Sequence, residues 1–245
     1  MELRKSERKK VKIKLAIQGC SGTGKTYSSL LLAKGLTNDD YSKVAVIDSE
    51  GGSADLYAHL GDFNVLTLKP PYCPSKYIKA IDLCINQGIE VIVLDSISHC
   101  WTYLLELHSK LDGKNSFMNW KQITPLQDEF INKILYADVH IIATMRTKQN
   151  YVLNNINGKI VPEKIGLKAI QRNDIEFEFS LVFKIDSEHF AKVTKNRTSL
   201  FESSDKFIIN SGTGKKIREW CNNELKFEKD SQVIRKEEIV EGKNA

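Results

Sequence analysis

The chain has 245 residues, of which 41% are hydrophobic, and this is enough to bury the core of one large α/β domain. No apolar run reaches the 18 residues of a membrane span, and the charged N-terminus is not followed by the apolar region of a signal peptide, so we expect a cytoplasmic protein that does not contact membranes. Five scattered cysteines without metal-ligand spacing argue against a zinc site and a disulfide framework.

The net charge of +5 is unevenly distributed. Residues 1–14 carry seven basic and two acidic side chains, residues 15–145 sum to −4, residues 146–218 to +6 and residues 219–245 to −2. We expect one domain over residues 11–223, between a basic arm (1–10) and a charged tail (224–245). The basic parts are where a polyanion would bind, although a solvated terminus is the alternative for the arm.

The first strong signal lies directly after an apolar run at residues 11–17, which predicts a strand. The pattern G-x-x-x-x-G-K-[ST] follows it, and a helix is expected from Thr26 to Leu36. Glycines there let backbone N–H groups converge on phosphate oxygens at the start of a helix. The nucleotide-binding residues that we expect are Gly19, Cys20, Ser21, Gly22, Thr23, Gly24, Lys25, Thr26 and Tyr27. Lys25 would reach the β- and γ-phosphates of ATP, and the Thr26 hydroxyl would bind Mg²⁺.

Short apolar runs alternate with helical segments over the next 120 residues. Strands are expected at residues 43–48, 64–68, 89–94 and 139–144, and helices at 75–86 and 125–136, with an irregular stretch between 96 and 119. Three tryptophans, Trp101, Trp120 and Trp220, are expected in the core. This alternation predicts a doubly wound, mostly parallel sheet with helices on both faces, which binds ligands beyond the carboxyl ends of its strands.

The pattern changes after Arg146. Residues 149–166 predict a β-hairpin or a mobile loop, and period-two alternation at 175–179 and 181–185 predicts strands. Further strands are expected at 190–194 and 206–210, and a last helix at 214–223. We expect these strands to extend the sheet as an antiparallel C-terminal part.

Two carboxylates end expected strands beside the phosphate loop. Asp95 is placed as a second Mg²⁺ ligand, with a helix N-cap as the alternative. Glu50 is placed to orient and deprotonate the water that attacks the γ-phosphate, with turn capping as the alternative and Asp48 as the second candidate base. His99 is expected to be a local hydrogen-bonding residue near the nucleotide.

The segments at residues 19–26, 46–51, 91–99 and 194–197 together resemble the RecA-like P-loop ATPases. The blocks at residues 95–99, 143–148 and 162–167 look more closely like the phage-encoded ATP-binding proteins of the RecA/RadA-related single-strand-annealing recombinase group. The resemblance implies ATP hydrolysis with Mg²⁺ by a homo-oligomer in DNA recombination or repair, inside the host cytoplasm if the protein is phage-encoded. It also implies single-stranded DNA and a single-strand-binding protein as partners.

The resemblance also assigns residues. It implies that Glu50 activates water and that Lys195 and Arg197 reach the γ-phosphate in a neighbouring subunit, with a solvated strand end as the alternative. Arg146 would sense phosphate or touch DNA, or belong to an ordinary charged loop. The region that corresponds to DNA-binding loops offers Lys148, Tyr151, Lys159, Lys164, Lys168 and Arg172. Two other functions stay open, a nucleotide-gated switch or assembly factor with a protein partner, and a P-loop kinase.

Overall fold

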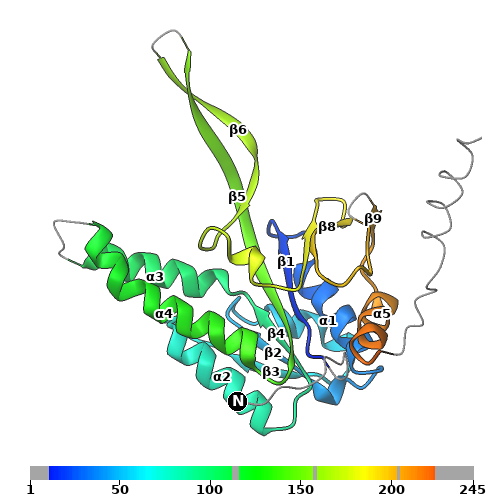
Figure 1. Cartoon of the computed structure of the whole chain (residues 1–245). Helices are drawn as coiled ribbons and strands as arrows, with labels where there is room; N and C mark the ends of the chain where they lie inside the picture. Colours follow the sequence, from blue (N-terminus) through cyan, green and yellow to red (C-terminus); the bar gives the residue numbers. More distant parts are fainter. Residues whose placement is uncertain (1–10, 112–115, 157–158, 203–204, 224–245) are drawn as a thin grey trace, which may run out of the picture.

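The computed structural model describes residues 11–111, 116–156, 159–202 and 205–223 (Figure 1). The expected basic arm and charged tail lie outside these residues. No helix in the described part is long and apolar enough to cross a bilayer.

One sheet of nine strands runs through the described residues, in the order β3-β2-β4-β5-β1-β7-β8-β9, with β6 paired to β5. The strands from β3 to β7 in this order pair in parallel, while β8 pairs antiparallel with β7 and β9 antiparallel with β8. The strands are β1 (Lys14–Gly19), β2 (Val44–Asp48), β3 (Asn64–Thr67), β4 (Val91–Asp95), β5 (His140–Ile156), β6 (Lys159–Ala169), β7 (Leu181–Ile185), β8 (Ala191–Asn196) and β9 (Lys206–Phe207). The predicted doubly wound sheet with an antiparallel C-terminal extension is confirmed, except that β7 joins β1 in parallel.

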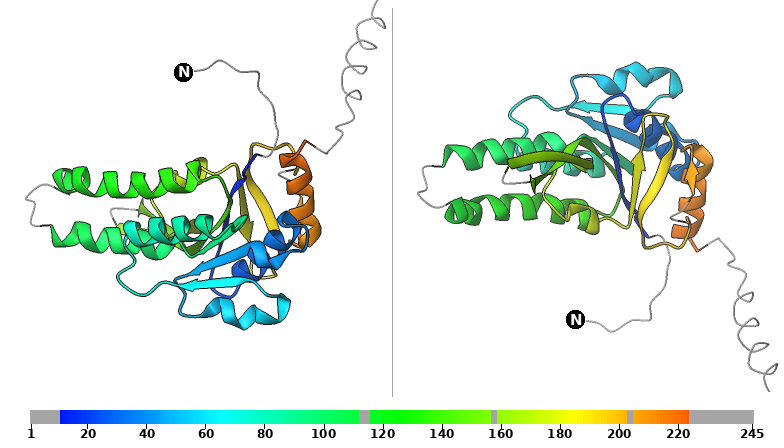
Figure 2. Two further views of the ribbon diagram at one scale, coloured as in Figure 1. Left: turned by 90° about the horizontal axis from the view of Figure 1, so that it is seen from below. Right: turned by 90° about the horizontal axis from the view of Figure 1, so that it is seen from above.

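Helices cover both faces of this sheet (Figure 2). They are α1 (Lys25–Leu36), α2 (Pro74–Asn86), α3 (Ser98–Lys110), α4 (Ser116–Tyr136) and α5 (Ser211–Cys221), with short 3₁₀ helices at Tyr41–Lys43, Ser53–Leu60 and Ile175–Phe177. Side chains of β1 alternate between two cores, because successive residues of a strand point to opposite faces. Leu15 and Ile17 pack with α1 and α5, whereas Ala16 packs with α2 and α4.

The longest strand, β5, leaves the sheet and continues as one arm of a hairpin (Figure 1). Its residues from Thr147 to Ile156 pair antiparallel with β6, with an irregularity in register between Asn150 and Tyr151. Of the two structures expected for residues 149–166, the hairpin is the one that forms.

Three predictions about secondary structure are wrong. The stretch 96–119 is not irregular, because α3 occupies most of it and α4 begins at Ser116 rather than at Pro125. Ile123, which precedes Pro125, is buried in the core, and the helix therefore includes the residues on the N-terminal side of the proline. Residues 175–179 are not a strand: Ile175 and Phe179 are buried while Phe177 is 58% exposed, a spacing of four that fits helical turns.

His140 begins β5 as a buried base. Its Nδ1 accepts a hydrogen bond from the Ile13 N–H at 3.1 Å. Burial, together with the charges of the nearby Lys12 and Lys14, lowers the pKa of His140 to about 3. The folded protein therefore holds this ring neutral where an unfolded chain would protonate it.

Acidification below pH 6.5 should consequently destabilise the fold through His140. Its contribution to the free energy of unfolding is present above the ordinary pKa of 6.5 and decreases by up to about 1.4 kcal/mol per pH unit as the pH falls toward 3. His140→Asn keeps an acceptor for Ile13 but cannot titrate. Urea unfolding of both proteins from pH 7 to pH 4 should show a shallower decrease for the variant, and parallel curves would contradict this origin of acid sensitivity.

Candidate active site

The phosphate loop connects β1 to α1 as the sequence predicts. Gly22 and Gly24 have φ values of 82° and 84°, a region that residues with side chains rarely adopt, and α1 begins at Lys25. The Lys25 ammonium donates to the Cys20 carbonyl at 2.7 Å, so it lies over its own loop. Burial lowers the pKa of Lys25, and the carboxylates of Asp95 and Glu50 oppose that shift. The loop thus presents a helix N-terminus and a cation to one point, as phosphate binding requires.

Asp95 ends β4 beside this loop and is almost fully buried. The Thr26 hydroxyl donates to its Oδ2 at 2.6 Å, and the Thr144 hydroxyl donates to its Oδ1 at 2.5 Å. Burial raises the pKa of Asp95, although both hydroxyl hydrogen bonds act in the opposite direction. Among the described residues, the Asp95 carboxylate accepts hydrogen bonds from two hydroxyl groups and not from backbone N–H groups at the start of a helix. Asp95 is therefore not a helix N-cap, which was the alternative. The oxygens of Thr26 and Asp95 are ligands of the kind that Mg²⁺ prefers, so the residues fit this cation.

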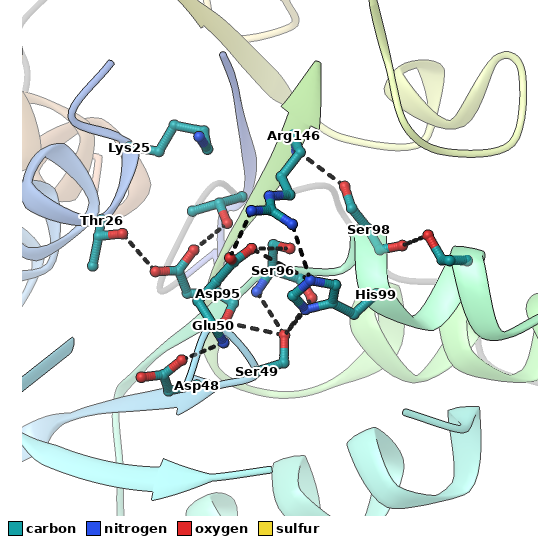
Figure 3. A network of polar contacts seen from close by, with 12 residues as sticks. Lys25, Thr26, Asp48, Ser49, Glu50, Asp95, Ser96, Ser98, His99 and Arg146 are labelled. Carbon is teal, nitrogen blue, oxygen red and sulfur yellow. Dashed lines mark hydrogen bonds and ion pairs between the residues drawn. The ribbon is translucent and has the colours of Figure 1, made fainter. Parts of the chain in front are cut away.

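Glu50 follows β2 and turns toward the same site (Figure 3). Its Oε1 accepts a hydrogen bond from the Ser96 hydroxyl at 2.8 Å, and its Oε2 lies 3.4 Å from a nitrogen of Arg146. Asp48 is fully buried and accepts from the backbone N–H groups of Glu50 and Ala54 at 2.5 and 3.2 Å. Asp48 therefore caps the turn, a role that the sequence left open for Glu50, and the Glu50 carboxylate is the one directed at the site.

Arg146 connects Glu50 to a second group of polar residues. It is the partner of Gly19 in the β1–β5 register, so it lies at the entrance of the phosphate loop. Its NH1 lies 3.2 Å from His99 Nε2, and because a guanidinium only donates, that ring nitrogen accepts. The other nitrogen, Nδ1, then carries the proton and donates to the Ser49 hydroxyl at 2.9 Å. His99 is confirmed as a local hydrogen-bonding residue, and it orients Arg146.

Glu50, Asp95, Arg146 and the phosphate loop from Ser21 to Thr26 line one cavity of about 690 Å³. Tyr27 lies in its wall with its ring 5.8 Å from that of Tyr57, and His189 lies 3.1 Å from the Thr23 carbonyl through Nδ1. The sequence did not single out Tyr57 or His189, because each reaches the loop from a distant segment. The full lining consists of Ser21, Gly22, Thr23, Gly24, Lys25, Thr26, Tyr27, Ser28, Glu50, Ser53, Tyr57, Asp95, Arg146, His189, Ile208 and Ile209. The predicted metal ligands, the Glu50 base and the predicted nucleotide-binding residues other than Gly19 and Cys20 thus share one cavity that is large enough for a nucleotide.

Lys195 and Arg197 lie elsewhere. Lys195 is in β8 and Arg197 follows it, and both side chains donate to the Phe177 carbonyl, Arg197 at 3.2 Å. Neither residue belongs to the lining of the nucleotide cavity. Burial lowers the pKa of Lys195, and the charge of Arg197 acts in the same direction. The two cations therefore do not serve the phosphate loop of their own chain in this structure.

The cations expected to contact DNA are spread along the hairpin and its base. Lys148, Lys164 and Lys168 are exposed, and Arg172 forms an ion pair with Asp128 at 2.8 Å. Tyr151 pairs with Lys164 in the backbone ladder, and Lys159 begins β6, but their side chains lie outside the described part of the structure.

The chain was compared with protein families, curated proteins and solved structures. A family model described as an AAA domain matches residues 11–222. No curated protein matches the chain. Among solved structures, a KaiC-like protein from the hyperthermophilic archaeon Pyrococcus horikoshii OT3 is 16% identical, with a TM-score of 0.48 over 81% of this chain and 86% of that chain. Since the family model covers nearly all of the described residues, the chain belongs to the AAA domain family of P-loop ATPases.

Proposed function

We propose that the protein is a RecA-like, Mg²⁺-dependent ATPase that binds single-stranded DNA and acts in phage recombination or repair. One observation carries the hydrolytic part: the Glu50 carboxylate shares a cavity with Lys25, Thr26 and Asp95 and is held there by Ser96 and Arg146. A carboxylate beside a triphosphate site is the group that hydrolysis requires.

The phosphate loop and the charged residues around it each have a role in this proposal. The phosphate loop and Lys25 bind the β- and γ-phosphates, and Glu50 orients the attacking water and accepts its proton. Thr26 and Asp95 would hold Mg²⁺, which neutralises charge on the phosphates. Arg146 is able to exchange Glu50 for a phosphate oxygen, because both are anionic acceptors within reach of one guanidinium. That exchange would free Glu50 when ATP is bound.

In this proposal the two remaining cations act on the active site of a neighbouring subunit. Lys195 and Arg197 lie outside the cavity of their own chain, so they stabilise the transferring phosphoryl group only if another copy of the chain docks against them. The proposal therefore includes a homo-oligomer with shared active sites.

DNA binding is assigned to the hairpin and its base, where Lys148, Lys164 and Lys168 are exposed. Each lysine that neutralises a phosphate releases a counterion, so the logarithm of affinity falls linearly with the logarithm of salt concentration, with a slope of about −0.7 per contact on single strands. The triple substitution K148Q/K164Q/K168Q should reduce that slope by about 2.

The measurement is fluorescence anisotropy of a labelled oligothymidylate between 50 and 300 mM salt, with ATP, with ADP and without nucleotide. Lys79→Gln is a matched control, because Lys79 is exposed on α2, at the opposite end of the molecule from the hairpin (Figure 1). If binding is absent or does not depend on salt while ATP hydrolysis is intact, DNA is not the partner. That result would favour the nucleotide-gated switch with a protein partner.

A further inference from the structure

A second cavity, of about 1050 Å³, lies between α3, α4 and the base of the hairpin. It shares no lining residue with the nucleotide cavity. We propose that it binds an unpaired base of a single-stranded polynucleotide. The inference rests on the proposed DNA binding and adds a specific receptor for the base.

One wall of the cavity is aromatic. Trp101 of α3 and Trp120 of α4 are half-buried and stack on each other, with ring centroids 5.9 Å apart and 18° between the planes. His108 stacks on Trp120 at 4.3 Å and extends the row of rings. Both tryptophans were expected in the core, and the structure corrects this, because α3 and α4 place them at a cavity instead. A flat aromatic surface next to open space is what a nucleobase stacks on.

The second observation is a buried acceptor without a donor. Gln127 is 1% exposed, and its Nε2 donates to Gln171 Oε1 at 3.3 Å. Gln171 is itself fixed, because its Nε2 donates to the Ile97 carbonyl and its Oε1 accepts from the Arg172 N–H. Gln127 must therefore offer its amide nitrogen to Gln171, and its Oε1 has no hydrogen-bond partner among the described residues.

An unpaired buried carbonyl oxygen is unfavourable until a donor reaches it. Gln127 belongs to the lining of the cavity, and because its Oε1 is itself buried, a bound molecule supplies that donor when the side chain shifts toward the cavity. All four DNA bases carry N–H groups on the edge that is free in a single strand. The Gln127 oxygen thus supplies the polar anchor that a stacked base requires, without selecting one base over the others.

The third observation places the phosphates. Lys148 and Lys168 are direct partners in the antiparallel ladder, so their side chains project from the same face, and both line the cavity. Like charges directly opposite each other are unfavourable, and among the described residues neither lysine forms an ion pair. An anionic backbone along this face would relieve the repulsion.

The acidic residues of the lining restrict where that backbone runs. Asp128 is paired with Arg172 at 2.8 Å, while Asp174 and Glu178 belong to the segment after β6. Their charge excludes phosphates from that side. The phosphates therefore follow the hairpin lysines while the base enters toward the tryptophans. A neutral apolar ligand would use the rings but leave the lysine pair unexplained.

The test uses the full chain with Trp220→Phe, which leaves Trp101 and Trp120 as the only tryptophans. Oligothymidylate and an abasic oligonucleotide of the same length are compared by anisotropy and by tryptophan fluorescence. The base-bearing strand should bind about 5- to 150-fold more tightly per engaged base and quench the emission, whereas the abasic strand should not quench it. Gln127→Met, which is similar in size but lacks the acceptor, should reduce this preference and leave abasic binding unchanged.

Trp120→Ala should abolish the preference, and Trp120→Phe, which keeps a ring, should retain part of it if the alanine variant does not fold. Equal binding of both strands without quenching overturns the base pocket alone and leaves the proposed ATPase and DNA binding intact. Absence of binding to either strand overturns the proposed DNA function and this inference with it. The Lys79→Gln control should behave like the parent protein in every arm.

Discussion

Replacing Glu50 with glutamine should slow ATP hydrolysis by about 10²- to 10⁴-fold while ATP binding stays close to that of the parent protein. The amide has the shape of the carboxylate and still accepts from the Ser96 hydroxyl, which lies 2.8 Å from Oε1. It cannot accept the proton of the attacking water. The loss therefore falls on the chemical step and not on the fold of the site.

Phosphate release and the binding of a fluorescent ATP analogue are measured on the same samples, with and without oligothymidylate. Glu90→Gln is the matched control, because this carboxylate lies before β4, far from the phosphate loop, and pairs with Lys43 at 2.7 Å. Hydrolysis by Glu50→Gln at the parental rate would exclude Glu50 as the base.

Lys195→Ala should lower the turnover number by about 10³-fold or more, the range in which cations supplied to a transferring phosphoryl group act. Its phosphate loop stays intact, because Lys195 contacts Phe177 and not the nucleotide cavity. Lys25→Ala has the opposite defect, a damaged phosphate loop with intact Lys195. In a mixed oligomer, sites that combine a Lys195→Ala phosphate loop with Lys195 of a Lys25→Ala neighbour should recover activity.

The rate is followed as the two variants are mixed at constant total protein, and it should pass through a maximum. Lys25→Ala mixed with Glu50→Gln is the control pair, because both changes damage the same half of the site and no combination restores it. A flat profile in the first mixture would contradict shared sites. A fully active Lys195→Ala protein would remove this residue from catalysis altogether.

The parts of the site that follow from the sequence are those that a local pattern fixes. Asp95 at the end of β4, Glu50 just after β2 and Arg146 at the point where β5 passes the end of β1 reach the same edge as the phosphate loop in a parallel sheet of this kind. The sequence could not place Ser96 and Ser49 as partners of Glu50 and His99, since those contacts depend on how neighbouring strand ends meet in three dimensions. His189 contacts Thr23 across 166 positions of the chain for the same reason.

The misjudged elements have a common physical origin. Tryptophan is a residue type typical of a core, and only the packing of α3 beside α4 at the base of the hairpin decides that Trp101 and Trp120 border a cavity. Residues 175–179 alternate in polarity as a strand does, yet tertiary packing buries the first and the fifth and turns the segment into a 3₁₀ helix. The sequence shows which residues are apolar, but tertiary packing determines which of them are buried and which border a cavity.

The continuity of β5 has a mechanical consequence. The strand carries Arg146 at the nucleotide cavity and then, without a break, the residues from Thr147 to Ile156 that form the hairpin. At about 3.4 Å per residue that segment is a lever arm about 34 Å long, so a tilt of about 5° at Arg146 displaces its far end by about 3 Å. If ATP binding exchanges the ion-pair partner of Arg146 as proposed, a small change beside the γ-phosphate would become a movement comparable to the spacing of stacked bases.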